Sequence, residues 1–348
     1  MSNLEIGGRQ IGEGSCFVIA EAGVNHNGDF DLARRLIDAA VSAGVDAVKF
    51  QTFQPELLVS PDGPMADYQA VNTGGEGSQL EMLRGLSLST EAFEKLAQHA
   101  ADQDICFLST AFDEPSVDFL ETLGVPAFKV PSGEITNHPF LSYIAGKAKP
   151  VLLSTGMSSS REVVEAVKIL QTTCSAPFAL LHCVTNYPAL PAECNLRAID
   201  TMRELFEVPV GWSDHTDGIA IGIAAVARGA AIIEKHFTLD RSFPGPDHAA
   251  SIEPETLITF VKAVRDVDLS LGDGIKRPTP SEQRICRVVR RSLHLRRDLP
   301  QGHVLTEADL VALRPGGGIP PGARQAIVGR RLCAEFSRGH LLQEIDLD

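Results

Sequence analysis

One pattern recurs along most of the chain: a short apolar run that ends in polar residues. Eight such runs occur, and helical patterns lie between most of them. Because the apolar starts suit parallel strands covered by helices, eight strand–helix units predict a (β/α)8 TIM barrel. The runs are FVIAEAG from Phe17, DAVKFQTF from Asp46, CFLSTAF from Cys106, AFKVPSG from Ala127, PVLLSTG from Pro150, FALLHCVT from Phe178, PVGWSDH from Pro209 and AIIEKHF from Ala231.

The competing architecture is a doubly wound, dinucleotide-binding sheet. That fold would need a GxGxxG phosphate fingerprint directly after the first strand. The corresponding stretch, EAGVNHNG, lacks this spacing. We therefore expect residues 1–272 to form the barrel.

The composition changes after Leu271. GDGIKRPTPSEQ is rich in turn formers and predicts a linker, which we place at 273–286. Residues 287–348 are basic and predict a small β-rich domain with many turns. A domain of this size is marginal for an independent core, so docking or exchange between subunits would help to stabilise it.

The segment Val59–Leu83 differs from the other connections. It is rich in Gly, Pro, Asp and Ser and follows the second predicted strand. A long loop after a barrel strand lies on the catalytic side, so we expect this segment to act as a lid.

The overall charge and the cysteine pattern exclude several protein classes. The formal net charge is -14, which argues against a general nucleic-acid surface. No apolar run is long enough for a membrane helix, and MSNLEIGGRQ has no signal-peptide pattern. The seven scattered cysteines, without a CxxC pair, are expected to be reduced thiols in a cytoplasmic protein.

The carboxyl ends of barrel strands surround the active site, so the polar run ends are expected to share one pocket. His215 and His236 end two neighbouring strands and can converge on one divalent ion with open positions, which suits Mn²⁺ or a similar metal. Lys235 alternates with Glu234 and His236, so it is expected to face outward in a barrel-to-helix ion pair.

Lys49 and Lys129 stand inside apolar runs, where a lysine is costly unless it meets an anion or a carboxylate. Together with Ser132, Ser154 and Ser213 they would bind a phosphate or a carboxylate. One of the lysines could instead form a Schiff base, as in class I aldolases. The histidine pair favours the first interpretation, an anion site beside a metal.

Two acidic residues, Glu21 and Glu134, also stand at strand ends. Either one could transfer protons or bind a hydroxyl group, and either could simply neutralise a nearby lysine.

Seven motifs in this order resemble one known family. They are IAEAGVNHNGD, AVKFQTF, FKVPSGE, LLSTGM, GWSDHT, IEKHFTLDRSFPGPDHAAS and LRPGGGI. The chain resembles the sialic acid synthases and, more broadly, the nonulosonic acid synthases. The resemblance covers nearly the whole chain, and residues 287–348 are similar to the antifreeze-like (SAF) domain that these enzymes carry.

The resemblance implies a reaction. Phosphoenolpyruvate would condense with open-chain N-acetylmannosamine, with cleavage of the C–O bond and release of phosphate, in the presence of Mn²⁺ or Mg²⁺. The alternative acceptor is 2,4-diacetamido-2,4,6-trideoxymannose, the substrate of an N,N'-diacetyllegionaminate synthase. Two other classes remain as hypotheses, namely a Schiff-base keto-acid aldolase and a non-catalytic binding protein.

The resemblance also implies roles for individual residues. Thr185 and Asn186 remain alternatives for the same phosphate contact. The catalytic residues would be Glu21, His215 and His236, the last two as metal ligands; the phosphoenolpyruvate site Lys49, Lys129, Ser132, Ser154, Thr185, Asn186 and Ser213; and the sugar site Gln51, Thr110, Glu134, Tyr187, Asp247 and Arg314.

Arg314, in LRPGGGI, carries a further implication of the resemblance. In the family, the C-terminal domain of one subunit reaches over the barrel of its partner, and the matching arginine contacts the N-acetyl group of the sugar. The resemblance therefore implies a domain-swapped homodimer. The basic C-terminal segment of this acidic chain agrees with docking onto an acidic barrel face.

Overall fold

The computed structural model describes residues 4–12, 14–74 and 78–348. Residues 1–3, 13 and 75–77 lie outside the described residues. The first three belong to the N-terminal stretch that shows no signal-peptide pattern, and residues 75–77 belong to the expected lid. The chain divides into two compact units, residues 1–272 and 273–348. The expected boundary between linker and small domain, at 286/287, falls inside a helix, α12 (Pro280–Val289).

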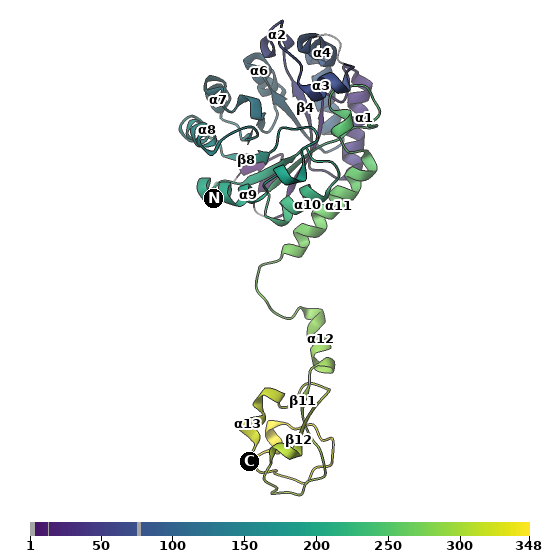
Figure 1. Cartoon of the computed structure of the whole chain (residues 1–348), viewed down its shortest axis with the longest axis vertical. Coiled ribbons are helices and arrows are strands. Elements are labelled where there is room, and N and C mark those ends of the chain that lie inside the picture. The colour runs from purple at the N-terminus through teal and green to yellow at the C-terminus, as the bar shows by residue number, and fades with distance from the viewer. Residues whose placement is uncertain (1–3, 13, 75–77) are drawn as a thin grey trace. The chain divides into compact units, whose positions relative to one another are not determined.

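Residues 1–272 form the expected barrel, a closed ring of eight parallel strands (Figure 1). Neighbouring strands in the ring are also neighbours in sequence, and β10 closes the ring against β3. The strands are β3 (Phe17–Gly23), β4 (Ala47–Thr52), β5 (Cys106–Ala111), β6 (Phe128–Val130), β7 (Val151–Ser154), β8 (Phe178–Cys183), β9 (Val210–Asp214) and β10 (Ile232–His236).

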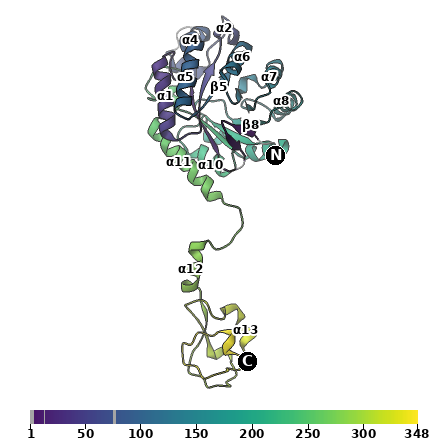
Figure 2. The same ribbon diagram turned by 180° about the vertical axis from the view of Figure 1, so that it is seen from behind.

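Helices cover the outside of the barrel, as the view from behind also shows (Figure 2). Local sequence sets where they begin and end: the Asp29 side chain accepts a hydrogen bond from the amide of Leu32 at the start of α1, and Gly44 ends that helix with φ 73°. The covering helices are α1 (Phe30–Ala43), α5 (Thr90–Asp102), α6 (Glu114–Leu123), α7 (His138–Ala145), α8 (Ser160–Thr173), α9 (Arg197–Phe206), α10 (Ala220–Ala227) and α11 (Pro254–Leu271).

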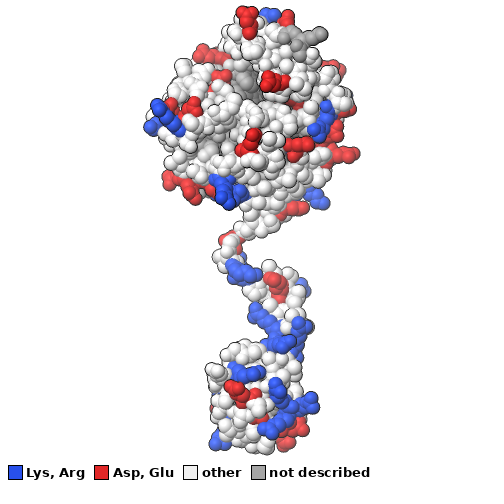
Figure 3. All heavy atoms as spheres, viewed as in Figure 1, with Lys and Arg blue, Asp and Glu red and all other residues white. Residues whose placement is uncertain are grey.

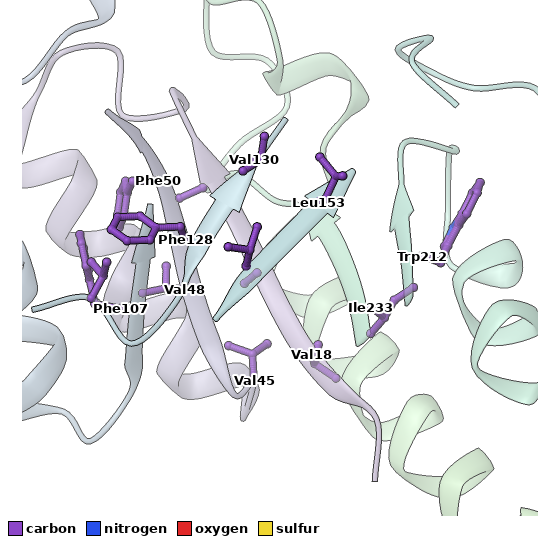
Figure 4. Packing of buried hydrophobic residues seen from close by; sticks show 14 of the residues in the cluster. Val18, Val45, Val48, Phe50, Phe107, Phe128, Val130, Leu153, Trp212 and Ile233 are labelled. Carbon is purple, nitrogen blue, oxygen red and sulfur yellow. The ribbon is translucent and has the colours of Figure 1, made fainter. Parts of the chain in front are cut away.

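Alternation along the strands separates two cores. Outward side chains such as Val18, Val48 and Ile233 pack with the helices in the larger core, part of which Figure 4 shows. Inward side chains such as Ile19 and Leu152 fill the lower barrel. Residues of a short hairpin, β1 (Leu4–Ile6) and β2 (Arg9–Ile11), pack against this inner layer and plug that end of the barrel.

Three short helices lie between β4 and α5, and we call them the lid helices. The first precedes the segment expected to form a lid, Val59–Leu83, the second lies within it, and the third begins within it and ends three residues after it. They are α2 (Pro55–Leu58), α3 (Asp67–Asn72) and α4 (Gln79–Leu86). The segment is tied to the loop after β10, because Asn72 Nδ2 donates a 2.6 Å hydrogen bond to the carbonyl of Pro246.

Residues 273–348 contain α12, the antiparallel pair β11 (Ser292–Leu295) and β12 (Leu310–Leu313), a short α13 (Arg324–Ile327) and many turns. Leucine and isoleucine side chains, among them Leu293 and Leu342, form a separate small core. Lys and Arg outnumber Asp and Glu in this unit, and Figure 3 shows Lys and Arg side chains along α12 and over the visible face of the unit, with Asp and Glu among them.

Two turns of this unit share one sequence pattern, HVLTEADL from His303 and HLLQEIDL from His340. In each turn a histidine contacts the carboxylate of the aspartate six residues later, at 3.0 Å for His303–Asp309 and 2.9 Å for His340–Asp346. The same aspartate accepts a hydrogen bond from a backbone amide in its own turn. Side-chain capping therefore orders turns that the small core alone would hold poorly.

None of the helices in the described part of the chain is both long and apolar enough to cross a membrane.

Candidate active site

The chemistry-bearing side chains follow directly from the strand alternation. Ile19, Ala47 and Ile232 point into the barrel as an apolar layer. The inward positions two residues further along the same strands are Glu21, Lys49 and Glu234, which are also buried. The apolar layer thus closes the barrel from below, and the polar ring above it, at the carboxyl ends of the strands, forms the floor of the open end.

This ring lines a cavity of about 390 Å³. Most of the residues singled out from the sequence lie on its wall. The cavity is lined by Glu21, Lys49, Gln51, Thr110, Lys129, Ser132, Ser154, Thr185, Tyr187, Ser213, His215, His236 and Asp247, together with Glu234 and residues of the lid.

Lys49, on β4, is held by side chains of both neighbouring strands, β3 and β5. Its Nζ lies 2.5 Å from Glu21 Oε2 on β3 and donates a 2.8 Å hydrogen bond to Thr110 Oγ1 on β5. Gln51 Nε2 donates to the other oxygen of Glu21 at 3.1 Å. Glu21 and Lys49 are therefore fixed in position before any substrate arrives.

Glu234 joins the two buried lysines, and no role was predicted for it from the sequence. Its oxygens lie 3.5 Å from Lys49 Nζ and 3.6 Å from Lys129 Nζ, and Ser213 Oγ donates to it at 2.7 Å. Strand alternation places Glu234 on the same face as His236. The polar end of this run was expected in the pocket, but nothing in the sequence shows that Glu234 contacts both lysines.

The two glutamates of the ring differ in their pKa. Burial raises the pKa of Glu21, and the nearby Glu234 adds to this effect, so that Lys49 only partly offsets it. Burial also acts to raise the pKa of Glu234, but Lys129 and Lys49 outweigh it and hold that pKa well below the ordinary value. Glu234 thus stays ionised, whereas Glu21 can carry a proton.

A set of small hydroxyl groups lies beside Lys129. Ser132 Oγ accepts a 2.9 Å hydrogen bond from the amide of Gly156, and within the described residues neither Ser154 Oγ nor Thr185 Oγ1 has a hydrogen-bond partner. Buried hydroxyls without a partner are costly in the absence of a ligand, so they indicate a site for an acceptor-rich group. Of the two alternatives, Thr185 lines this cavity, whereas Asn186 is exposed and hydrogen-bonds Glu193 at 3.3 Å.

The histidine pair stands on the other side of the ring, at the ends of β9 and β10. The rings of His215 and His236 lie 5.3 Å apart between centroids. His215 Nδ1 contacts the carbonyl of Val184 at 2.7 Å, so Nδ1 carries the proton and Nε2 holds the lone pair, which the Tyr187 hydroxyl approaches at 3.1 Å. Burial lowers the pKa of both histidines, which keeps the imidazoles neutral as metal ligands must be.

The donor set fits a divalent metal ion with open positions. Two neutral imidazoles meet edge to face, and His236 Nδ1 has no partner among the described residues. No cluster of three or more His, Cys, Asp or Glu side chains with metal-binding geometry occurs in the part of the chain that the structure describes. The remaining ligands would therefore come from substrate and water, as in a catalytic site and unlike a closed structural one.

An aromatic stack connects this pair to the lid. Tyr187 stacks on His215 with 4.2 Å between ring centroids, and Tyr68 of α3 stacks on Tyr187 at 5.0 Å. Asp247 lines the same region, and burial raises its pKa to about 6. Sequence reasoning missed Tyr68, because the lid gives no periodic signal by which its inward residues could be recognised.

Three other predicted residues lie elsewhere. Glu134 is half-buried next to the cavity but hydrogen-bonds Asn137 Nδ2 at 2.7 Å, and Arg314 is an exposed residue of the second unit. Lys235 faces outward as expected, but the expected barrel-to-helix ion pair is wrong. Its Nζ contacts Asp214 Oδ2 on the neighbouring strand at 3.0 Å, because both side chains point outward at adjacent positions of β9 and β10.

Comparisons with known proteins agree with this geometry. The model of the NeuB family matches residues 36–276, and that of the SAF domain matches residues 290–348. The N,N'-diacetyllegionaminic acid synthase of Legionella pneumophila is 48% identical over 94% of this chain and 93% of its own length. The enzyme of the same name from Campylobacter jejuni is 44% identical over 94% of this chain and 98% of its own.

A solved structure shows the same fold. The crystal structure of an N-acetylneuraminic acid synthetase from Leptospira borgpetersenii, in complex with citrate, superposes with a TM-score of 0.73 at 36% identity, over 81% of this chain and 94% of that one.

Proposed function

The chain belongs to the NeuB family, and from that premise we propose that it condenses phosphoenolpyruvate with an N-acetylated, mannose-type aldehyde to give a nonulosonic acid. One water is consumed and phosphate is released with cleavage of the C–O bond. The observation that carries this proposal is the pair of buried lysines around Glu234, directly beside two neutral histidines. This arrangement of two cations beside a potential metal site suits the binding of a small trianion next to a polarised carbonyl group.

The floor of the cavity would bind phosphoenolpyruvate. Lys49 and Lys129 offset its negative charge, and Ser132, Ser154 and Thr185 offer hydroxyls to the phosphate oxygens. Because Glu234 stays ionised between the lysines, it fixes their ammonium groups in place and limits their mutual repulsion. Ser213, which donates to Glu234, would complete the arrangement.

Glu21 is the proposed proton carrier. A carboxyl group whose pKa is raised by burial can donate a proton to the aldehyde oxygen as it becomes a hydroxyl, and can assist in opening the sugar ring. Gln51 and Lys49 hold that carboxyl in one orientation.

His215 and His236 would hold a divalent ion, for which we propose Mn²⁺ or Mg²⁺. When bound, such an ion polarises the aldehyde and supplies an activated water. The two histidines set its place at the top of the ring, and Tyr187 packs over them to exclude bulk solvent.

The acceptor that we propose is 2,4-diacetamido-2,4,6-trideoxymannose. The two legionaminic acid synthases support this choice over N-acetylmannosamine because of their identity over nearly the whole chain. Asp247, Tyr187, Gln51 and Thr110, which line the cavity, would bind the sugar. Glu134 would reach it only by leaving its contact with Asn137.

We further propose a domain-swapped homodimer in which the partner subunit's Arg314 contacts the N-acetyl group of the sugar. A cytoplasmic location is also proposed, which suits the seven free thiols.

The proposed acceptor is tested by comparing kcat/KM for two sugars at saturating phosphoenolpyruvate and Mn²⁺. We expect 2,4-diacetamido-2,4,6-trideoxymannose to be used more efficiently than N-acetylmannosamine. The reverse order would identify a sialic acid synthase with the same chemistry. Cleavage of the nonulosonic acid into pyruvate and the sugar, with the pyruvate imine trapped by borohydride on Lys49 or Lys129, would instead identify the aldolase.

A further inference from the structure

One side of the cavity is strongly apolar. Six side chains form what we call the apolar wall, and all six line the cavity: Phe53, Leu58, Val59, Met82, Leu83 and Phe112. They pack against one another in a hydrophobic cluster that is separate from both barrel cores. Phe53 and Phe112 follow β4 and β5, and the other four come from α2, from its C-terminal end and from α4.

The wall is part of the reaction site, because the lid that carries it reaches the histidine pair. Tyr68 of α3, between α2 and α4 in the chain, stacks on Tyr187, which in turn stacks on His215. The same lid is hydrogen-bonded through Asn72 to the loop that carries Asp247. A molecule whose aldehyde lies at the histidines therefore has the wall within the same enclosed space.

Among the described residues, Lys49 and Lys129 are the only lysine or arginine side chains that line the cavity, and both stand at its floor. The lid residues outside the described part are Gly75, Glu76 and Gly77, which include no basic side chain. The charge that acts on Tyr68 of the lid is negative, since Asp247 adds to the effect of burial in raising the pKa of its phenol. An anionic substituent on the far end of the acceptor would meet no cation there from this chain's barrel unit.

The orientation of the acceptor follows from the reaction. Its C1 must meet phosphoenolpyruvate at the floor, so its other end, C6, points away from the floor and towards the lid. We propose that the apolar wall binds the C6 end of a 6-deoxy acceptor and selects against acceptors with a C6 hydroxyl or a 6-phosphate. This inference rests on the proposed function and assigns the specificity to named residues.

The physical basis is asymmetric. A methyl group at C6 would be removed from water against leucine, methionine and phenylalanine side chains, which is favourable. A hydroxyl group there would lose its water without gaining a partner, and a phosphate would lose far more. Differences of one such group typically change kcat/KM by about tenfold or more.

The test uses two neighbouring leucines of α2 as a matched pair. Leu58 lines the cavity, whereas Leu57 is 56% exposed and does not line it. We would measure kcat/KM for N-acetylmannosamine, its 6-deoxy analogue and its 6-phosphate, with Mn²⁺, in the wild type and in Leu58→Asn and Leu57→Asn. The KM for phosphoenolpyruvate checks that the floor is intact.

The wild type is expected to prefer the 6-deoxy analogue to N-acetylmannosamine by about tenfold and to use the 6-phosphate least. Leu58→Asn should reduce that preference several-fold, because kcat/KM for the 6-deoxy analogue falls while the KM for phosphoenolpyruvate is unchanged. Leu57→Asn should leave the preference for the 6-deoxy analogue as in the wild type. Met82→Gln, which changes polarity at nearly constant volume, should act like Leu58→Asn and serves if the latter does not fold.

The inference is overturned if the wild type does not distinguish the two sugars at C6, or if the preference survives in both wall variants. This outcome is separable from a failure of the proposed function. If the protein prefers the 6-deoxy analogue, and this preference depends on Leu58, the apolar wall has the proposed role. If the same protein does not use the 2,4-diacetamido sugar, only the proposed acceptor is wrong.

Discussion

Asp247 is a buried carboxylate whose charge state decides what it can bind. Burial raises its pKa to about 6, so it is protonated below that pH and ionised above it. The ionised form is the stronger acceptor for sugar hydroxyls. Because the folded-state pKa lies above the ordinary value, ionising this group costs stability as pH rises through about 6 in the substrate-free protein.

We therefore predict that the KM of the acceptor increases as pH falls below about 6, with less change in the KM of phosphoenolpyruvate. Asp247→Asn should raise the acceptor KM at pH 7 by about tenfold and remove this pH dependence, because the amide does not titrate. Steady-state kinetics between pH 5 and 8 would check it. A variant that retains the wild-type profile would show that another group titrates.

At this scale, the sequence predicted the cavity residues that lie on strands. Alternation fixes which side of a strand a residue faces, so Glu21, Lys49 and Lys129 could be placed from the sequence. Glu234 ends the eighth run and was expected in the same pocket, but its contact with both lysines was not predicted. Tyr68 and the apolar wall could not be predicted, since loop residues are positioned by tertiary contacts and not by a period.

At the scale of elements, the turn after β9 positions His215. Asp214 Oδ1 accepts hydrogen bonds from the amide and the hydroxyl of Thr216, while Lys235 Nζ contacts Asp214 Oδ2 and donates to the carbonyl of Thr216. These three residues are buried behind the strands. They join the ends of β9 and β10, the two strands that carry the histidine pair.

Lys235→Met should lower the free energy of unfolding by about 3–5 kcal/mol, because it leaves Asp214 buried without its counter-ion. The double variant Lys235→Met/Asp214→Asn should be more stable than the single one, since it leaves no unpaired charge. Urea unfolding followed by the fluorescence of Trp212 would measure both. If the single and double variants lose the same free energy of unfolding, the packing around the methylene chain of Lys235, rather than its ion pair with Asp214, stabilises the protein.

The strands of the barrel were predicted well from the sequence, because the same strand–helix unit repeats eight times. Eight apolar runs separated by helices allow few arrangements, because parallel strands need covered crossover connections. The starts of the eight runs coincide with the observed strands to within about a residue or two. The lid helices α2 and α3 were not predicted, since each is about one or two turns long and lacks an apolar stripe of its own.

At the scale of the whole molecule, we propose that each active site needs two chains. The second unit is basic although the chain as a whole carries a net charge of -14, which favours docking onto an acidic surface. The sequence could not establish this arrangement on physical grounds, because Arg314 followed by Pro315 and three glycines is equally typical of an exposed turn.

Co-expression of two inactive variants tests the exchange. His236→Ala should remove the metal site of its own barrel, and Arg314→Ala should remove the contact in its partner's barrel. Mixed dimers then contain one intact site, so statistical mixing should restore about a quarter of wild-type activity. If the C-terminal domain served its own barrel, the mixture would show only the activity of the separate variants.

The most direct test of the central claim is phosphate release from phosphoenolpyruvate with Mn²⁺, measured together with consumption of the acceptor sugar. The account predicts one phosphate for each sugar consumed, no release without the sugar, and loss of both signals in EDTA and in His236→Ala with the fold intact. Release that persists without an acceptor, or turnover that is unaffected by EDTA and by His236→Ala, would contradict it.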